Sequence, residues 1–255
     1  MPYFKSGEGK IFYRAQGAGT ALVFIHGALG SHNLWERQVP LFSSKYRVVT
    51  LDVRGHGSSF KPHTGYQLQK MLEDIRGLLN YLSIRKAVLI GSSMGGVIAQ
   101  MFACEDPSRV KALVLVGTLA KAIWFGKADQ HAKTVASEGY NKGVISWFTP
   151  DSKRKDIRMA LLAASKVSPY FLTGVILENP NWDIRKDLSR IVAPTLVIVG
   201  KEDTNTTPVR ESRIIHRLIA NSIMRIVPGA GHLVMLEKPE VFNEMLYRFL
   251  KENRL

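Results

Sequence analysis

A cluster of small residues between two apolar segments at 87–100 constrains the fold of this chain more than any other stretch. The segment 87–90 is typical of a buried strand, and the apolar residues after Gly96 recur with helical period. Only a sharp turn can join the two. The pentapeptide GSSMG at 91–95 fits the pattern G-x-S-x-G, in which the serine lies at the tip of a strand-to-helix turn with its hydroxyl clear of the sheet. Ser93 is therefore a candidate nucleophile.

The helix that begins after Ser93 supplies a second reason for this role. Its first turn would point unpaired backbone N–H groups and the positive end of the helix dipole at the serine hydroxyl. An anion that forms beside Ser93 would therefore be stabilised. The alternative interpretation of the pentapeptide is a tight turn with no catalytic role, and the rest of the chain has to distinguish the two.

Apolar runs alternate with helical stretches along the chain, which predicts an α/β fold. Runs rich in Val, Ile and Leu, typical of strands buried on both faces, lie at 21–26, 46–51, 87–92, 111–117, 195–200 and 222–227. Two short strands at 3–5 and 10–15 are expected to add an antiparallel edge. Helical stretches lie at 33–43, 66–82, 94–105, 207–219 and 239–252. The alternation predicts an eight-stranded, mostly parallel sheet with helices on both faces.

The interval after the predicted strand at 111–117 breaks this alternation. It contains apolar helical segments at 121–138, 143–148, 154–166 and 169–177, with prolines between them. We expect residues 120–190 to form a helical lid over the carboxyl ends of the strands, where an open parallel sheet binds its ligand. Residues 1–119 and 191–255 would then form the core. A separate packing unit without a role at the site is the alternative.

Composition and charge indicate a soluble globular protein. No apolar run approaches the roughly 18 to 20 residues that a membrane span needs, and the first thirty residues hold no long apolar segment, so we expect a cytoplasmic protein without membrane insertion. The formal net charge of +14 would suit nucleic-acid binding. However, Lys and Arg are spread over the whole chain without an aromatic ladder, which favours a solvated basic surface. The single cysteine, Cys104, cannot form an internal disulfide.

Two further side chains could activate the serine. A serine nucleophile needs a base to take its proton, and the base needs a partner that fixes its tautomer. His232 lies in a glycine-rich loop directly after the last predicted strand, and Asp203 lies just past the end of the strand before it. Both should therefore leave the sheet at the same edge as Ser93. The order Ser, Asp, His, each after its own strand, supports a common site.

With these motifs in register, the chain resembles the α/β-hydrolase superfamily over essentially its whole length. Within the superfamily it is most similar to the branch of serine esterases and enol-lactonases. The matching motifs are His26-Gly27-Ala28, 52–58, 91–96, 200–203 and Gly231-His232, followed by Glu237-Lys238-Pro239. The resemblance implies a catalytic triad of Ser93, His232 and Asp203. It also implies an oxyanion hole made by the backbone N–H groups of Ala28 and Met94, and structural roles for His26 and His56.

The chain departs from the superfamily pattern in the loop after the acid and in the residue after the histidine. Relatives commonly have a proline four residues after the acid, whereas Pro208 follows Asp203 by five, so the loop is one residue longer and Glu202 becomes a competing candidate. The end of the sixth strand, another source of the acid in some relatives, has no carboxylate at 116–119. Relatives that break carbon–carbon bonds tend to have an aromatic residue after the histidine, where this chain has Leu233.

The sequence therefore predicts a cofactor-free carboxylesterase that cleaves small esters through an acyl-enzyme on Ser93, with water activated by His232. Lactonase, C–C bond hydrolase, perhydrolase and acyltransferase activities stay open, because the same triad serves all of them. The non-enzyme alternative is a hydrolase-fold binding or receptor module. No metal-ligand cluster or dinucleotide fingerprint occurs in the sequence. The expected partner is a small-molecule ester and not nucleic acid, and the expected state is a monomer or homodimer.

Apolar side chains in the predicted lid favour particular substrates. The larger ones are Ile123, Trp124, Phe125, Trp147, Phe148, Tyr170, Phe171 and Leu172. Most of them must pack within the lid, and the remainder would line an apolar pocket of limited depth. Short or medium acyl chains and small aromatic esters are therefore expected substrates. Neutral esters should be preferred, since a buried charge needs a partner.

Overall fold

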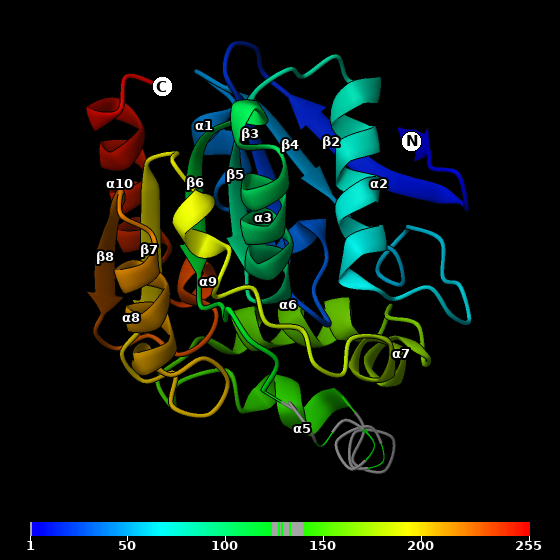
Figure 1. Cartoon of the computed structure of the whole chain (residues 1–255). Helices are drawn as coiled ribbons and strands as arrows, with labels where there is room; N and C mark the ends of the chain where they lie inside the picture. Colours follow the sequence, from blue (N-terminus) through cyan, green and yellow to red (C-terminus); the bar gives the residue numbers. More distant parts are fainter. Residues whose placement is uncertain (1, 124–126, 128, 130–132, 134–139) are drawn as a thin grey trace.

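The predicted strands form a single eight-stranded sheet in this computed structural model, which describes residues 2–123, 127, 129, 133 and 140–255 (Figure 1). The strand order is β1-β2-β4-β3-β5-β6-β7-β8. The pairs β1–β2 and β2–β4 are antiparallel, and β3 to β8 pair in parallel. The predicted fold class is thus confirmed. The strands are β1 (Tyr3–Lys5), β2 (Lys10–Gln16), β3 (Ala21–Ile25), β4 (Arg47–Leu51), β5 (Ala87–Ser92), β6 (Val110–Val116), β7 (Thr195–Gly200) and β8 (Ser222–Val227).

Helices cover both faces of the sheet. In Figure 1 the helices α2, α3 and α8 lie in front of it and α1 and α10 lie behind it. The short helix α9 and three 3-10 turns connect these elements in the described part of the core. The bounds are α1 (Val39–Phe42), α2 (Leu68–Tyr81), α3 (Met94–Glu105), α8 (Val209–Leu218), α9 (Val234–Glu237) and α10 (Pro239–Glu252), with 3-10 turns at His32–Trp35, Pro107–Arg109 and Leu188–Arg190.

One predicted helix is wrong. The segment 33–43 is not continuous, since a 3-10 turn at His32–Trp35 and the short helix α1 are separated by turn residues 36–38. Pro40 lies in the first turn of α1, where its missing N–H is harmless, but in the middle of a longer helix it would remove a backbone hydrogen bond. The apolar spacing reflects two separate contacts, because Trp35 and Phe42 are both buried.

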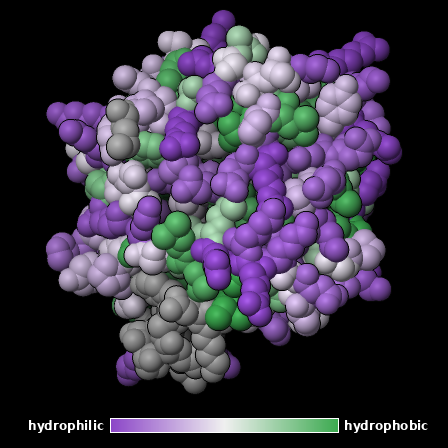
Figure 2. All heavy atoms as spheres, turned by 180° about the vertical axis from the view of Figure 1, so that it is seen from behind, coloured by the Kyte–Doolittle hydropathy of each residue, from purple (hydrophilic) through white to green (hydrophobic). Residues whose placement is uncertain are grey.

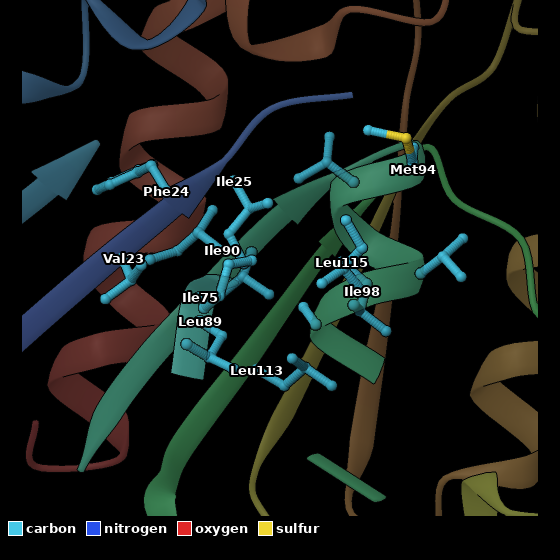
Figure 3. Close-up of a cluster of buried hydrophobic side chains, with 14 of the residues drawn as sticks. Val23, Phe24, Ile25, Ile75, Leu89, Ile90, Met94, Ile98, Leu113 and Leu115 are labelled. Carbon is cyan, nitrogen blue, oxygen red and sulfur yellow. The ribbon is translucent and has the colours of Figure 1, made fainter. Parts of the chain in front are cut away.

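The core lies on both sides of the central strands. All residues of β3, β5 and β7 are buried, and Figure 3 shows side chains of β3, β5 and β6 beside Met94 and Ile98 of α3. Burial of each such aliphatic side chain contributes about 1.5–3 kcal/mol, so these strands anchor the loops at their carboxyl ends. Hydrophilic side chains cover most of the rear face, with apolar residues in small groups between them (Figure 2).

The chain between β6 and β7 forms an insertion at one end of the sheet (Figure 1). Its described helices are α5 (Tyr140–Ile145), α6 (Arg154–Ala164) and α7 (Phe171–Glu178). The two ends of the insertion are paired, because the Ala122 N–H donates to Trp182 O and the Ile184 N–H to Ala120 O, both at 2.9 Å. Much of the predicted helix 121–138, with Trp124 and Phe125, lies outside the described residues. The boundaries at 120 and 190 stay a prediction.

The close packing of α3 on β3 predicts how substitution of Gly95 affects stability. A Cβ at Gly95 would lie 2.3 Å from Ile25 O and 2.6 Å from His26 O, so backbone would have to move. We expect Gly95→Ala to lower the free energy of unfolding by about 1–3 kcal/mol. Gly143→Ala is the matched control, because a Cβ at this exposed helical position meets nothing within 4 Å. Urea unfolding compares the two variants, and equal midpoints would contradict the expectation.

Candidate active site

Ser93 occupies the sharp turn between β5 and α3 that the sequence predicts. Its backbone has φ 52° and ψ −120°, a conformation that is strained for a residue with a side chain. The turn is held by its neighbours, since the Ser93 N–H donates to Val116 O at 2.9 Å. A Cβ at Gly91 would lie 2.4 Å from Gly95 O, so only glycine lets the strand end approach the start of the helix so closely.

The loop after β3 lies directly against the serine. A Cβ at Gly27 would lie 2.8 Å from Ser93 Cβ and 3.5 Å from Ser93 Oγ. The next two N–H groups along the loop differ in their bonding. The Leu29 N–H donates to His56 Nε2 at 3.2 Å. The Ala28 N–H has no acceptor among the described residues. The N–H of Met94, in the first turn of α3, likewise has none there. Both predicted oxyanion donors are thus available in the described part of the chain.

His26 and His56 hold loops, as the resemblance implies. The buried His26 ring bonds the carbonyl of the next residue at 2.7 Å through Nδ1 and accepts the Val53 N–H at 3.0 Å through Nε2. His56 bonds a carbonyl two residues upstream through Nδ1 at 3.0 Å and accepts the Leu29 N–H. Burial lowers the pKa of both imidazoles, that of His56 to about 3. Neutral rings with both nitrogens engaged have no free position for proton transfer.

The structure brings Asp203 and His232 into direct contact. His232 Nδ1 lies 2.7 Å from Asp203 Oδ2, and both side chains are almost fully buried. The carboxylate also accepts the backbone N–H groups of Thr206 and Thr207 at 3.2 and 3.1 Å and the Thr207 hydroxyl. Burial alone would raise the pKa of Asp203, but the hydrogen bonds from His232 and Thr207 outweigh it and lower the pKa to about 2. The carboxylate is therefore ionised at neutral pH.

Glu202, the competing acid, serves a different purpose. Its Oε2 accepts the Ala230 N–H at 3.1 Å, and its own N–H donates to Ala230 O at 3.0 Å. Glu202 therefore fastens the loop before His232 and does not bond the imidazole. The extra residue in the loop from Asp203 to Pro208 is accommodated by the two threonine N–H groups that cap the Asp203 carboxylate.

Ser93 and His232 lie on either side of the end of β6. The Ser93 carbonyl accepts the Thr118 hydroxyl at 2.7 Å, which places the serine beside residues 116–118. Gly117 has φ +49°, and a Cβ there would lie 3.3 Å from His232 Nδ1. Among the described residues, no hydrogen bond joins Ser93 Oγ to His232. Such bonds are often long in unliganded hydrolases and shorten when substrate binds.

Other nucleophile and metal candidates are weaker. Cys104 is buried, and burial raises the pKa of its thiol to about 11, so it stays protonated at neutral pH. The described residues contain no group of three or more side chains arranged to hold a metal ion. They also contain no helix long and apolar enough to cross a bilayer.

Three contacts around His232 are missing from the sequence prediction. Thr207 bonds the Asp203 carboxylate and lies 3.2 Å from His232 Nδ1 through its hydroxyl. Trp147 accepts the His232 N–H through its carbonyl at 2.7 Å, and the two rings are 5.5 Å apart. Glu237 accepts the Gly231 N–H at 2.9 Å. Only Glu237 had a signal in the sequence, since it belongs to the motif that follows the histidine.

A strained serine turn and a buried aspartate–histidine pair at the carboxyl ends of parallel strands are an arrangement typical of hydrolases with an α/β sheet. The pattern of the α/β hydrolase fold matches residues 20–155. The chain is 30% identical to 3-oxoadipate enol-lactonase 2 of Acinetobacter baylyi, over 91% of this chain and 88% of that protein. The chain belongs to the α/β-hydrolase family, and its resemblance is confirmed.

Two further similarities cover nearly the whole chain. A putative non-heme chloroperoxidase of Synechocystis is 28% identical, over 98% of this chain and 100% of that protein. The structure of a thermophilic esterase from Thermogutta terrifontis superposes with a TM-score of 0.89 at 26% identity, and the match covers 97% of this chain and 95% of that one. The similar proteins are named for different activities, and what they share with this chain is the family.

The buried histidines predict that acid destabilises the fold. Burial lowers the pKa of His26 and brings that of His56 to about 3, from an ordinary value of 6.5. Below about pH 6.5 the unfolded chain therefore binds more protons than the folded chain. As the pH decreases, the free energy of unfolding falls by up to about 1.4 kcal/mol per pH unit for each histidine. Asp203 adds to this loss of stability only at lower pH, between the ordinary pKa of its carboxyl group, 3.8, and its pKa of about 2 in the folded chain.

Urea unfolding at about pH 7.5, 6 and 5 measures this slope. The expected result is an unfolding midpoint that falls from the first to the last of these values. A midpoint that is the same at all three would mean that the two imidazoles are not held neutral by the fold.

Proposed function

We propose that this protein is a serine hydrolase that cleaves small carboxylic esters through an acyl-enzyme on Ser93. In this proposal His232 is the general base, Asp203 orients it, and the N–H groups of Ala28 and Met94 form the oxyanion hole. The single observation that supports it most is the 2.7 Å bond between His232 Nδ1 and the ionised Asp203 carboxylate, next to a strained serine turn. That bond leaves His232 Nε2 as the free nitrogen of the ring.

The reaction then follows from this geometry. His232 Nε2 takes the proton of Ser93 Oγ while Oγ attacks the ester carbonyl carbon, and the negative charge that develops on the carbonyl oxygen is met by the two N–H groups. Collapse of the tetrahedral intermediate breaks the bond to the alcohol, which leaves with the proton from His232. A water molecule then gives a proton to His232 and attacks the acyl carbonyl carbon. As the bond from the acyl carbon to Ser93 Oγ breaks, His232 returns that proton to Oγ, and the carboxylic acid is released.

We also propose that the insertion at 120–190 acts as a lid and supplies the acyl pocket. Phe171 is fully buried and contacts the rings of His56 and Tyr66, with centroids 4.1 and 5.3 Å away, so this side chain packs the insertion onto the core. Trp147 is only partly buried, and its ring lies 5.5 Å from that of His232. An apolar wall beside the histidine favours short, uncharged acyl groups over charged ones.

A lactonase is the second candidate. The observation in its favour is the 30% identity to a protein named as an enol-lactonase, across 91% of this chain. A lactone is a cyclic ester, so the same attack by Ser93 opens the ring and the leaving alcohol stays joined to the acyl group. The machinery at Ser93 is common to both activities, and only the pocket distinguishes them.

Covalent labelling tests the nucleophile. A fluorophosphonate should modify Ser93 and no other serine, because among the serines that the structure describes this one lies at the strained turn beside the proposed base and oxyanion donors. Ser93→Ala should abolish the labelling and lower kcat by about three orders of magnitude or more. Peptide mapping by mass spectrometry identifies the labelled residue, and Ser92→Ala is the matched control. Label on Ser92 would refute the assignment, and an unlabelled but folded wild-type protein would favour a binding module.

A substrate panel tests the pocket. For p-nitrophenyl esters, kcat/KM should rise as the acyl chain lengthens, since each buried methylene contributes about 0.8 kcal/mol, and should fall once the pocket is full. Five-membered lactones measured alongside distinguish the two candidates. A maximum at long acyl chains, or a preference for a carboxylated ester over its neutral analogue at high salt, would show that the pocket is not short and apolar.

A further inference from the structure

The insertion contacts the backbone of the loop that carries His232. The His232 N–H donates to Trp147 O at 2.7 Å. A Cβ at Gly231 would lie 2.4 Å from the same carbonyl oxygen, so a side chain at 231 would push the two segments apart. Residue 231 is therefore glycine because the insertion comes this close, and the backbone of the insertion is part of the support of the histidine.

Glu237 joins the same two segments through its carboxylate. Its Oε1 accepts the Gly231 N–H at 2.9 Å. Its Oε2 accepts three donors from the insertion: the Ser152 hydroxyl at 2.7 Å, the Thr149 N–H at 3.0 Å and the Thr149 hydroxyl at 3.2 Å. One carboxylate thus bonds the loop with one oxygen and the insertion with the other.

The three N–H groups that precede and include His232 each have a different support. That of Ala230 donates to Glu202, that of Gly231 to Glu237, and that of His232 to Trp147. Glu202 belongs to the core, whereas Trp147 belongs to the insertion, and Glu237 connects the two. The direction of the imidazole depends on this backbone. The bond to Asp203 fixes the Nδ1 atom, but the position of the His232 Cα atom, which carries the ring, is set by the loop.

A second link holds the insertion at the same place. Arg37 forms an ion pair with Asp156 of α6, which is buried, and donates to Leu236 O at 3.1 Å. Leu236 precedes Glu237 at the end of α9. The turn 147–152 and helix α6 are therefore both fastened to the short helix that follows the histidine.

We propose that Glu237 is a positioning residue for His232, and that it makes the turn 147–152 of the insertion part of the catalytic geometry. The inference rests on the proposed function, in which His232 Nε2 must align with Ser93 Oγ. Loss of either half of the Glu237 bridge lets the loop and the imidazole shift, and a shift of about 1 Å at a reacting group lowers the rate by about 100-fold. Substrate binding changes little, because Glu237 does not touch the substrate in this proposal.

Glu237→Gln and Glu202→Gln form a matched pair that tests this. A glutamine at 237 has one acceptor oxygen and turns its NH2 group toward the other segment, so either the Gly231 N–H or the Thr149 N–H loses its acceptor. A glutamine at 202 keeps the one acceptor that Ala230 needs. We expect Glu237→Gln to lower kcat for p-nitrophenyl butyrate by about 10- to 100-fold with KM within about twofold, and to slow fluorophosphonate labelling of Ser93 by a similar factor. Glu202→Gln should change kcat by less than about threefold.

A double-mutant cycle identifies the insertion as the partner. Ser152→Ala removes one donor to Glu237 and should lower kcat by several-fold, but it should add nothing to Glu237→Gln. Ser146→Ala is the neutral control, because its exposed hydroxyl donates to Gly143 O within the insertion at 2.7 Å and bonds no other described residue. Urea midpoints of all variants establish that each is folded, and Ser152→Ala gives the answer if Glu237→Gln does not fold.

The outcomes separate this inference from the proposed function. If wild-type Ser93 is labelled and Ser93→Ala is inactive, but Glu237→Gln matches Glu202→Gln in kcat and labelling rate, the positioning role is wrong and the proposed function stands. Additive effects of Ser152→Ala and Glu237→Gln would also overturn the role of the insertion. An unlabelled wild-type Ser93 would overturn the proposed function itself.

Discussion

The close approach of backbone segments around Ser93 is the constraint on which the rest of this structure depends. Helix α3 begins where it almost touches the ends of β3 and β5, and the glycines at 91 and 95 are required there because a Cβ would overlap main-chain atoms at 2.3–2.4 Å. This close approach, together with the bond from the Ser93 N–H to Val116 O, holds Ser93 at φ 52°. The strain at one residue is maintained by the burial of two strands and a helix on either side of it.

Buried polar groups hold the loops at the same edge of the sheet. The Asp52 carboxylate accepts the backbone N–H groups of His32 and Ser58 at 2.7 and 2.8 Å and lies 2.8 Å from His32 Nδ1. Burial alone would raise the pKa of Asp52, but the hydrogen bonds from the side chain and backbone of His32 help to lower it. The Arg54 guanidinium bonds the buried Asp74 at 2.6 and 2.9 Å. Each such group would be costly if it lost its partner, so the loops have few alternative conformations. The proposed catalytic atoms are therefore supported by rigid surroundings.

The sequence predicts most of this architecture because its strands are buried on both faces. Continuous Val, Ile and Leu runs locate β3 to β7 within one or two residues of their observed bounds, and the order of the motifs predicts that Asp203 and His232 leave the same edge. What the sequence could not predict depends on contacts between distant segments. The break between Trp35 and Val39 reflects two separate packing contacts, and the different bonding of the neighbours Glu202 and Asp203 depends on the path of the loop at 204–207. The bridge from Glu237 to Ser152 spans 85 residues and has no periodic signal.

The paired ends of the insertion have a consequence for how this chain can vary. The segments 120–122 and 182–184 lie side by side. The insertion is therefore attached to the core like a loop whose two ends are held next to each other. Doubling the length of such a loop costs only about 0.6 kcal/mol of closure entropy, so segments of very different size could be exchanged at this junction without loss of the sheet. An exchanged segment would still have to bring a carbonyl oxygen to the His232 N–H. The junction would accept new sequences, whereas the proposed role of His232 limits them to those that supply this acceptor.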